Sequence, residues 1–318
     1  MKKHNQTKSI KNILDKFHHS LIESHPNTYL IKNSVNKNSF QKCEIFLEKC
    51  INIELSSLEL AKLLEGDLFD DNKFLQFLGY GLNFKDSINS NKYSKLSFNE
   101  TKVYYEEGVE INLDRQSNKI YIKQIKSGAK TLLIDGTLKD TEIIYEGVKL
   151  QNISQKSKLK GFPINEKGLT GCVSLINLKV ERLKVNANNG SCEDSINFIN
   201  SKGNIDFIGI TNSMSDALDI DFSNLKIRNI SIDKAENDCV DFSYGNYVIE
   251  NLNLDYCGDK ALSVGEKSRL ILDNIVASNS NIGIASKDSS SVNFNNGNFN
   301  IVKTCLAAYK KNKNLKAV

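Results

Sequence analysis

Three stretches of the chain repeat one pattern at a spacing of 22 residues: SDALDIDF at 215–222, NDCVDFSY at 237–244 and DKALSVGE at 259–266. In each stretch the third position is Ala or Cys and the fourth is a larger apolar residue. A fixed period of this length is typical of solenoid proteins, in which each repeat forms one coil and buries its apolar face against its neighbours.

The period extends in both directions from these stretches. Stacked parallel strands lie about 4.8 Å apart, so each repeated position becomes a ladder of like side chains along the solenoid. We therefore predict a mainly β fold, a single right-handed parallel β-helix from about residue 101 to 310, with Leu218, Val240 and Leu262 in one interior column. The complete apolar column is Ile196, Leu218, Val240, Leu262, Ile284 and Leu306, and the small-residue column beside it is Ser195, Ala217, Cys239, Ala261, Gly283 and Cys305.

Two further columns refine this prediction. After residue 255 a second apolar set shifts by one residue, which we interpret as one extra turn residue in that coil. Asparagine recurs at a bend and predicts an internal ladder of side-chain amides. The shifted set is Leu272, Ile275 and Ala277, and the asparagines are Asn229, Asn251, Asn274 and Asn296.

The first hundred residues have a different pattern. Apolar residues at helical spacing predict helices over 8–23, 40–51 and 56–66, with a fourth short helix over 69–80. We therefore divide the chain into a mainly helical region, 1–100, and the β-helix, 101–318. Short β-rich segments bounded by turn residues begin the second part, at 103–105, 120–125, 131–134 and 143–145.

Composition limits the function. Apolar residues make up 40% of the 318 residues and charged residues 25%, as in a folded soluble protein. The net charge of +4, without a basic stripe, gives no indication of nucleic-acid binding. No signal peptide or membrane span is present, which predicts a cytoplasmic protein as written, or a surface or secreted one if the N-terminus is incomplete. The four histidines lie within residues 1–25 in no ligand pattern, so we expect no metal and no cofactor.

The cysteines are seven in number and form no CxxC pair. An odd, scattered set is typical of free thiols in a reducing compartment. Cys239 and Cys305 lie three coils apart, on the order of 14 Å, too far for a disulfide. The sequence therefore predicts free thiols.

Two polar columns face outward beside the apolar ones. Like charges about 5 Å apart repel, so a strip of stacked carboxylates is a candidate functional site. The alternative is that these aspartates cap turns by accepting hydrogen bonds from backbone N–H groups. The sequence leaves both interpretations open. The columns are Asn197, Asp219, Asp241 and Ser263, and Asp194, Asp216 and Asp238.

Four segments on successive coils resemble the four signatures of the polygalacturonase family of glycoside hydrolases, within the pectin-lyase-like superfamily. They are Ser215–Asp219, Asn237–Val240, Asp259–Gly265 and Gly283–Lys287. They are similar in order to the family's Asn-Thr-Asp-Gly, Asp-Asp-Cys, Gly-His-Gly with Leu-Ser-Ile-Gly, and Arg-Ile-Lys. Other segments, such as 168–172 and 192–195, resemble a bacterial β-helix group found in surface or polysaccharide contexts.

The resemblance covers about residues 192–290 and implies roles for its matching residues. Asp216 and Asp238 would be the catalytic acid and base. If the protein is such an enzyme, Asp219 and Asp241 would in addition flank the cleft, and Lys260 and Lys287 would bind a substrate carboxylate.

Three positions depart from the family pattern. Asn237 replaces one aspartate, Lys260 stands in place of the histidine, and Ala285 replaces the arginine. These changes argue against ordinary polygalacturonan hydrolysis.

Two functional hypotheses follow. The first is a β-helix protein that binds or structurally engages a glycan or polysaccharide, acidic or polyhydroxylated, without catalysis. The second is a diverged polysaccharide-active enzyme, of glycosidase or lyase type, that uses the stacked aspartates. The sequence after Tyr309 offers little to cap the last coil, so end-to-end association of solenoids is a further expectation.

Overall fold

The computed structural model describes residues 93–149 and 169–311, together with four short strands between residues 22 and 54. The chain divides into two compact units, 1–85 and 86–318. No helix in the described residues is long and apolar enough to cross a membrane.

In the first unit the described residues form a four-stranded antiparallel sheet in sequence order. Most of the region predicted to be mainly helical, including 56–66 and 69–80, lies outside the described residues, so its helical character stays a prediction. Within 40–51, however, the described residues belong to strands, where Ile51 and Ile53 alternate with polar neighbours at the two-residue period of a strand. The strands are β1 (Ile22–His25), β2 (Thr28–Lys32), β3 (Ser39–Glu44) and β4 (Lys49–Glu54).

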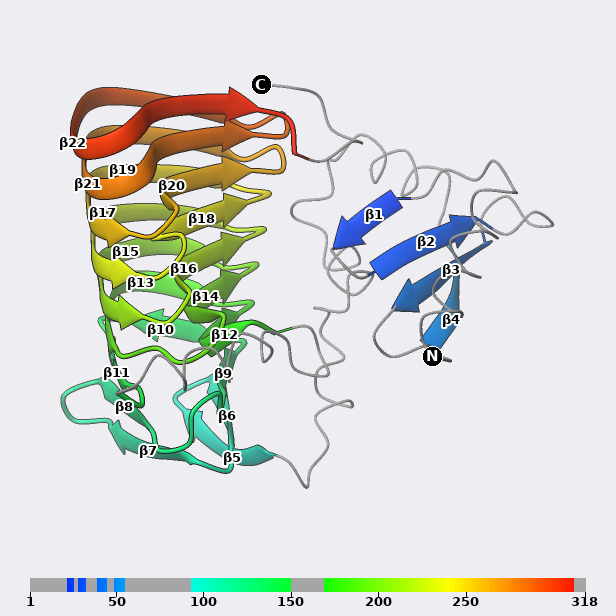
Figure 1. Cartoon of the computed structure of the whole chain (residues 1–318). Helices are drawn as coiled ribbons and strands as arrows, with labels where there is room; N and C mark the ends of the chain where they lie inside the picture. The colour runs from blue at the N-terminus through cyan, green and yellow to red at the C-terminus, as the bar shows by residue number, and fades with distance from the viewer. Residues whose placement is uncertain are drawn as a thin grey trace. The chain divides into compact units, whose positions relative to one another are not determined.

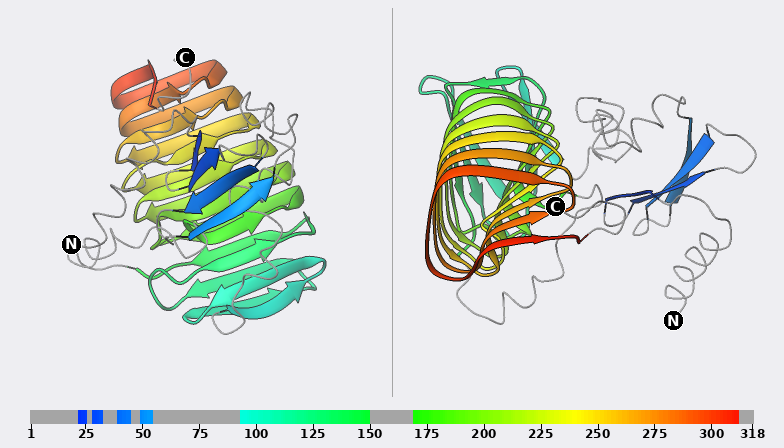
Figure 2. Two further views of the ribbon diagram at one scale, coloured as in Figure 1. Left: turned by 90° about the vertical axis from the view of Figure 1, so that its right-hand side faces the viewer. Right: turned by 90° about the horizontal axis from the view of Figure 1, so that it is seen from above.

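The second unit is a parallel β-solenoid, as the repeat predicts (Figures 1 and 2). Figure 2 shows the coils stacked from the cyan end to the red end, with strands on successive coils side by side. The strands that open the unit are β5 (Tyr93–Phe98), β6 (Thr101–Glu106), β7 (Val109–Asp114), β8 (Lys119–Gln124), β9 (Thr131–Ile134), β10 (Thr137–Lys139) and β11 (Glu142–Glu146). The coils that follow contain β12 (Gly171–Ile176), β13 (Lys179–Asn188), β14 (Asp194–Ile199), β15 (Lys202–Ser213), β16 (Asp216–Asp221), β17 (Asn224–Ala235), β18 (Val240–Ser243), β19 (Asn246–Cys257), β20 (Lys260–Gly265), β21 (Arg269–Lys287) and β22 (Ser291–Tyr309).

The opening strands differ from the later coils. The four segments predicted between 103 and 145 are confirmed as β6, β8, β9 and β11. However, β5 pairs with β6, and β7 with β8, as antiparallel hairpins, and parallel pairing begins only with β8–β11 and β9–β12. The reason is connection length: only two residues, Asn99 and Glu100, join β5 to β6, and so short a turn permits only antiparallel pairing. The parallel helix therefore starts later than residue 101.

The predicted interior column is confirmed. Leu218 pairs with Val240 and Val240 with Leu262 in parallel register, and all three side chains are fully buried. The asparagine column also forms, with each amide donating to the carbonyl oxygen of the asparagine one coil earlier at 3.0–3.1 Å. These amides are exposed, so the ladder lies on the outside of a bend and the prediction of an internal ladder was wrong. A bend places two consecutive residues outward, and the second of each pair is the asparagine.

Each coil turns at two corners where one residue, or in places two consecutive residues, adopts a left-handed backbone conformation. Asparagine tolerates this conformation well, whereas bulky and β-branched residues adopt it at a cost. The first corner contains Asn200, Phe222, Tyr244, Glu266 and Asp288, and the second contains Asn212, Lys234, Tyr256, Asn279 and Ile301.

The predicted one-residue shift occurs at the first corner of a single coil. Asn224 pairs with Asn246, 22 residues on, whereas Asn246 pairs with Arg269, 23 residues on. The extra residue lies in the turn where both Glu266 and Lys267 are left-handed. The next second corner is one residue shorter, and Lys260 again pairs with a residue 22 positions on, Ile282.

Two disulfide bonds correct the prediction of free thiols. Cys172 is bonded to Cys192, and Cys239 to Cys257, with Cα–Cα distances of 5.4 and 5.3 Å. The free-thiol prediction considered only Cys305, which shares a column with Cys239. The actual partner, Cys257, lies at the neighbouring corner. Cys305 itself is free and exposed.

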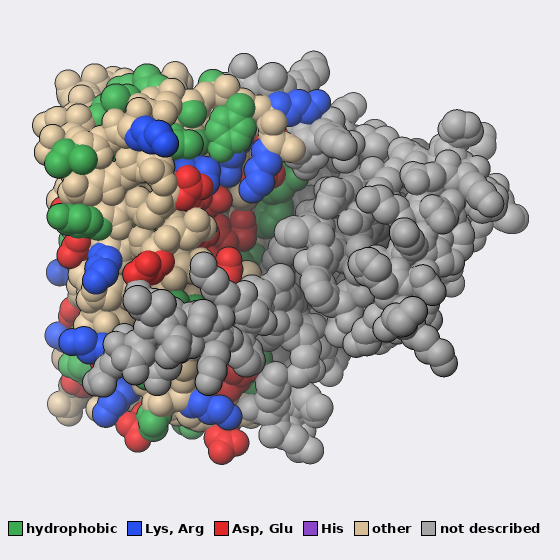
Figure 3. All heavy atoms as spheres, viewed as in Figure 1, with side chains coloured by type: hydrophobic (Ala, Val, Ile, Leu, Met, Phe, Trp, Pro, Cys, Tyr) green, Lys and Arg blue, Asp and Glu red, His purple; other side chains and the backbone are tan. Residues whose placement is uncertain are grey.

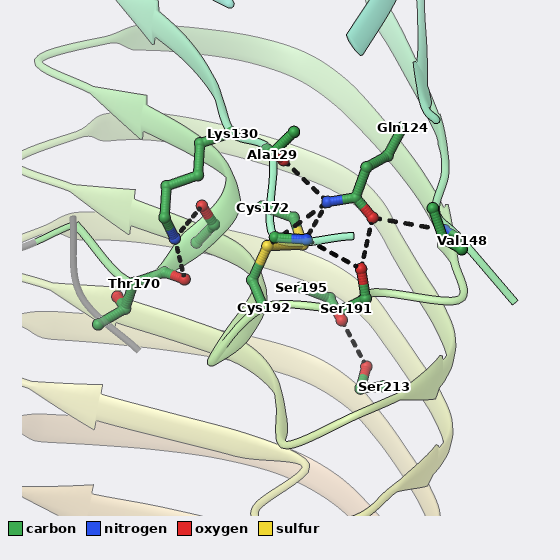
Figure 4. The surroundings of a disulfide bond; sticks show 12 residues. Gln124, Ala129, Lys130, Val148, Thr170, Cys172, Ser191, Cys192, Ser195 and Ser213 are labelled. Carbon is green, nitrogen blue, oxygen red and sulfur yellow. Dashed lines mark hydrogen bonds between the residues drawn. A yellow bond between two sulfur atoms is a disulfide. The ribbon is translucent and has the colours of Figure 1, made fainter. Parts of the chain in front are cut away.

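The Cys172–Cys192 bridge lies beside a buried amide (Figure 4). The Nε2 atom of Gln124 donates to Ala129 O at 2.8 Å and faces both sulfur atoms, while Oε1 accepts from Ser191 Oγ at 2.6 Å. A buried amide with both ends bonded fixes the geometry around it. The bridge therefore sits in an ordered interior position near the start of the parallel coils.

Candidate functional site

The predicted site residues come together on one sheet of the solenoid. This sheet contains β12, β14, β16, β18, β20 and the last residues of β21, and its register pairs Asp194 with Asp216 and Asp219 with Asp241. Figure 3 shows acidic and basic side chains gathered on one part of the visible face of the described unit. We call the following set the acidic strip: Asp194, Asn197, Asp216, Asp219, Asp221, Asp238, Asp241, Lys260 and Lys287.

One row of the strip, which we call the edge row, contains Asp216 and Asp238 and holds neighbouring coils together. Asp216 Oδ1 accepts a hydrogen bond from the backbone N–H of Asp238 at 2.9 Å and from Asn237 Nδ2 at 2.6 Å. Asp238 Oδ1 accepts one from the backbone N–H of Lys260 at 3.0 Å. Both aspartates therefore make the backbone contacts expected of turn-capping residues. Asn237 supports Asp216 as a hydrogen-bond donor.

The Lys260 ammonium group is bound within the row. Its Nζ lies 3.2 Å from each carboxylate oxygen of Asp238 and also contacts Asp259 Oδ2. Burial works against the charged ammonium, but the carboxylates of Asp259 and Asp238 outweigh it and raise the pKa of Lys260. The charge of Lys260 is thus neutralised by its neighbours.

A second row, which we call the middle row, contains Asn197, Asp219 and Asp241 and faces outward from the same strands. Asn197 Nδ2 donates to Asp219 Oδ2 at 2.9 Å, and on the next coil Asp241 Oδ2 lies 3.6 Å from Lys287 Nζ. The Lys287 side chain is 2% exposed and that of Asp241 is 25% exposed. The second lysine predicted to bind substrate is therefore also paired with a carboxylate of the strip.

The pKa values of the carboxyl groups in the strip are raised, which favours their protonated forms. Burial and the charge of Asp238 raise the pKa of Asp216 to about 7. Burial and the charges of Asp194 and Asp241 raise the pKa of Asp221 to about 8. Near neutral pH these two groups exchange protons readily, and each can then both donate and accept hydrogen bonds.

The pKa values of the other four aspartates are raised as well. For Asp194 and Asp219 the causes are burial and neighbouring carboxylates. For Asp238 and Asp241 the cause is burial, which the charges of Lys260 and Lys287 partly offset. These two are the carboxyl groups of the strip whose ionised form a lysine stabilises.

Three buried acceptor atoms in the strip, Asn197 Oδ1, Asp194 Oδ2 and Asp241 Oδ1, have no hydrogen-bond partner among the described residues. Asn197 and Asp194 are only 1% and 3% exposed. An unpaired buried acceptor costs about 1–3 kcal/mol, and a ligand that donates hydrogen bonds removes this cost. The sequence placed Asn197 and Asp194 in its outward columns but did not select them as site residues.

Asp221 was also missed, although a signal was present. It follows Asp219 by two residues in β16 and therefore shares its outward face. Its partial burial beside other carboxyl groups depends on tertiary packing, which the spacing does not reveal.

Two other features do not coincide with the strip. Among the described residues no group of His, Cys, Asp and Glu is arranged to hold a metal ion. A shallow groove runs along the second corner, where its lining includes Tyr256, Asn279 and Phe299 but none of the predicted site residues.

Comparison with protein-family models, curated proteins and solved structures found no match to this chain.

Proposed function

We propose that the acidic strip binds a neutral, polyhydroxylated glycan without cleaving it. The observation that carries this proposal is the set of three buried acceptor oxygens, on Asn197, Asp194 and Asp241, that receive no hydrogen bond from the described residues. Sugar hydroxyl groups are donors of the kind these oxygens require. The partly exposed Asp241 gives a ligand access to the same strip.

The charge balance favours a neutral ligand over an acidic one. The strip contains six aspartates against two lysines, and both lysines are paired with its carboxylates. A uronic-acid polymer would meet no free cation in the strip, and every carboxyl group that is ionised would repel it. A neutral polymer meets only hydrogen-bonding groups, repeated coil by coil along the solenoid.

Hydrolysis receives less support because the candidate base is occupied. A general base needs a free lone pair directed at the proton that it removes. Both oxygens of Asp238 contact Lys260, and one of them also accepts a backbone N–H. Asp238 therefore has a structural role, which is to join two neighbouring coils.

Asp219 offers the direct test of binding. Asp219→Ala removes the carboxyl group that holds the Asn197 amide in place. We therefore expect affinity for a neutral glycan to fall about tenfold, the equivalent of one hydrogen bond to the ligand, because Asn197 Oδ1 is no longer held in position to accept it. Calorimetric titration with soluble neutral oligosaccharides, chosen from a glycan array, measures the change. Asp233→Ala is the matched control and should bind normally, because Asp233 is an exposed aspartate on β17, a strand that carries no residue of the strip. Equal affinities of the two variants would refute the proposal.

The diverged enzyme remains a second candidate because of one observation, the pKa of about 7 at Asp216 beside Asp238. A carboxyl group protonated near pH 7 next to an ionised one is the pairing that glycoside cleavage uses.

Asp238→Asn separates catalysis from capping. We expect the substitution to lower the free energy of unfolding by about 1 kcal/mol, because Lys260 loses its charged acceptor, and to leave product formation from glycans at background level in both proteins. Thermal melts and product analysis by mass spectrometry measure the two effects. Glycan cleavage by the wild type that disappears in Asp238→Asn would establish the enzyme instead.

A further inference from the structure

The last coil exposes residues that every earlier coil buries. Among the described strands β22 pairs with β21 alone and lies at the end of the solenoid opposite β5 (Figure 1). Ile284 is 3% exposed, whereas Leu306, which stacks on it, is 56% exposed. Phe294 and Phe299 stack on the fully buried Leu272 and Ala277 but are themselves only partly buried.

This edge lacks the usual protection against strand pairing. Natural sheets block their edges with charges, prolines or bulges. Between Ser291 and Tyr309 the only charged residue is Lys303, and there is no proline. The edge of β22 is therefore a neutral pairing surface with apolar side chains along its inner side.

The sequence of β22 reads nearly the same in both directions about the bond between Asn296 and Gly297. Residues at equal distances from this centre are alike, in the run VNFNNGNFNI at 292–301. The pairs are Asn295 with Asn298, Phe294 with Phe299, Asn293 with Asn300, and Val292 with Ile301. A two-fold axis through the centre of an antiparallel pair brings together residues at equal distances from it, so such a strand is complementary to itself.

The local geometry fits this symmetry. The centre lies at the bend marked by the asparagine ladder, so the two arms of the coil flank the axis. The rings of Phe294 and Phe299 pack edge to face, 6.5 Å apart at 84°, across this centre. A Cβ atom at Gly297 would lie 2.9 Å from the Phe299 ring and 3.0 Å from the Phe294 ring, so glycine at this position lets the two rings pack in this arrangement without shifting.

We propose that β22 pairs antiparallel with β22 of a second copy of this chain, forming an end-to-end dimer with its two-fold axis between Asn296 and Gly297. In this register Phe294 lies opposite Phe299 of the other copy on the inner side, and asparagines lie opposite asparagines on the outer side. Aromatic and amide pairs of this kind stabilise adjacent antiparallel strands. The dimer covers the apolar ends of both solenoids at once.

Charge exchange at Asn293 and Asn300 tests both the dimer and its register. These exposed residues lie opposite each other across the proposed axis. The full-length wild type should be a dimer by light scattering coupled to size exclusion. Asn293→Lys with Asn300→Lys places like charges together and should raise the dimer dissociation constant at least tenfold. Asn293→Lys with Asn300→Glu places opposite charges together and should restore the dimer.

A cross-link provides an independent measurement. Opposite residues of an antiparallel pair lie close enough for a disulfide. Asn293→Cys with Asn300→Cys should therefore form a covalent dimer on oxidation, while either single variant should remain uncross-linked at that site, and circular dichroism should show all variants folded. A monomeric wild type, equal dissociation constants for the two charge variants, or the same cross-linking in single and double variants would overturn the proposal.

Discussion

Reduction of the disulfides is expected to lower the melting temperature of the β-helix by roughly 10 °C for each bridge. The bridges close loops with sequence separations of 20 and 18 residues, between Cys172 and Cys192 and between Cys239 and Cys257. Cross-links of this loop length stabilise a protein by about 3 kcal/mol, largely by restricting the unfolded chain. Thermal melts with and without reductant measure the effect.

Variants assign the effect to a particular bridge. Cys239→Ala with Cys257→Ala should melt at a lower temperature and respond less to reductant, whereas Cys305→Ser should behave as the wild type because Cys305 is free and exposed. Mass spectrometry of a non-reducing digest should find both cross-linked peptide pairs. Identical melting with and without reductant would contradict this expectation.

We propose that the protein works in an oxidising compartment, where such bridges persist. The sequence-based prediction of a cytoplasmic protein depended partly on free thiols, and the Cys172–Cys192 and Cys239–Cys257 bridges remove that support.

The stability of the β-helix is expected to fall as the pH rises from about 4 to about 8. Asp216 and Asp221 have pKa values of about 7 and about 8 in the folded protein, against 3.8 for a free aspartate. Within this window the folded state binds more protons than the unfolded state, so raising the pH favours unfolding. The melting temperature should be lower at pH 8 than at pH 5 by on the order of 5 °C.

Asp221→Asn separates this effect from general pH sensitivity. An amide needs no proton to remain neutral, so the variant should be more stable than the wild type at pH 8 and should show a smaller difference between the two pH values. Asp233→Asn, at an exposed position on β17, should retain the wild-type difference. A wild type that becomes more stable between pH 5 and pH 8 would contradict the raised pKa values.

The solenoid was predictable because its information is local and repeated. Leu218, Val240 and Leu262 each occupy the same place in one coil, so a single period located their column and the one-residue shift after residue 255. The antiparallel opening strands have no such period. Their pairing follows from short turns such as Asn99–Glu100, whose effect depends on where neighbouring strands lie.

The candidate site was predictable as a set of positions but not as a set of roles. Column arithmetic placed Asp216, Asp238 and Lys260 side by side, and the structure agrees. It could not show that Asp238 holds both the backbone and the ammonium group of Lys260, because those contacts depend on the rotation of side chains within a shared surface. The Cys239–Cys257 bridge escaped for a similar reason, since it joins two columns rather than members of one.

The compensated corner after Gly265 also bears on how such a chain varies in length. The extra residue beside Glu266 shifts the register of one arm of the coil by one residue. The next corner, between Ser278 and Ile282, is one residue shorter and restores the register. An insertion at one corner that is matched by a deletion at the next corner therefore changes the register of only half a coil. Neighbouring coils keep their pairing, so the molecule tolerates single-residue insertions and deletions at corners, and it can lengthen by duplication of whole coils without a change in its interior.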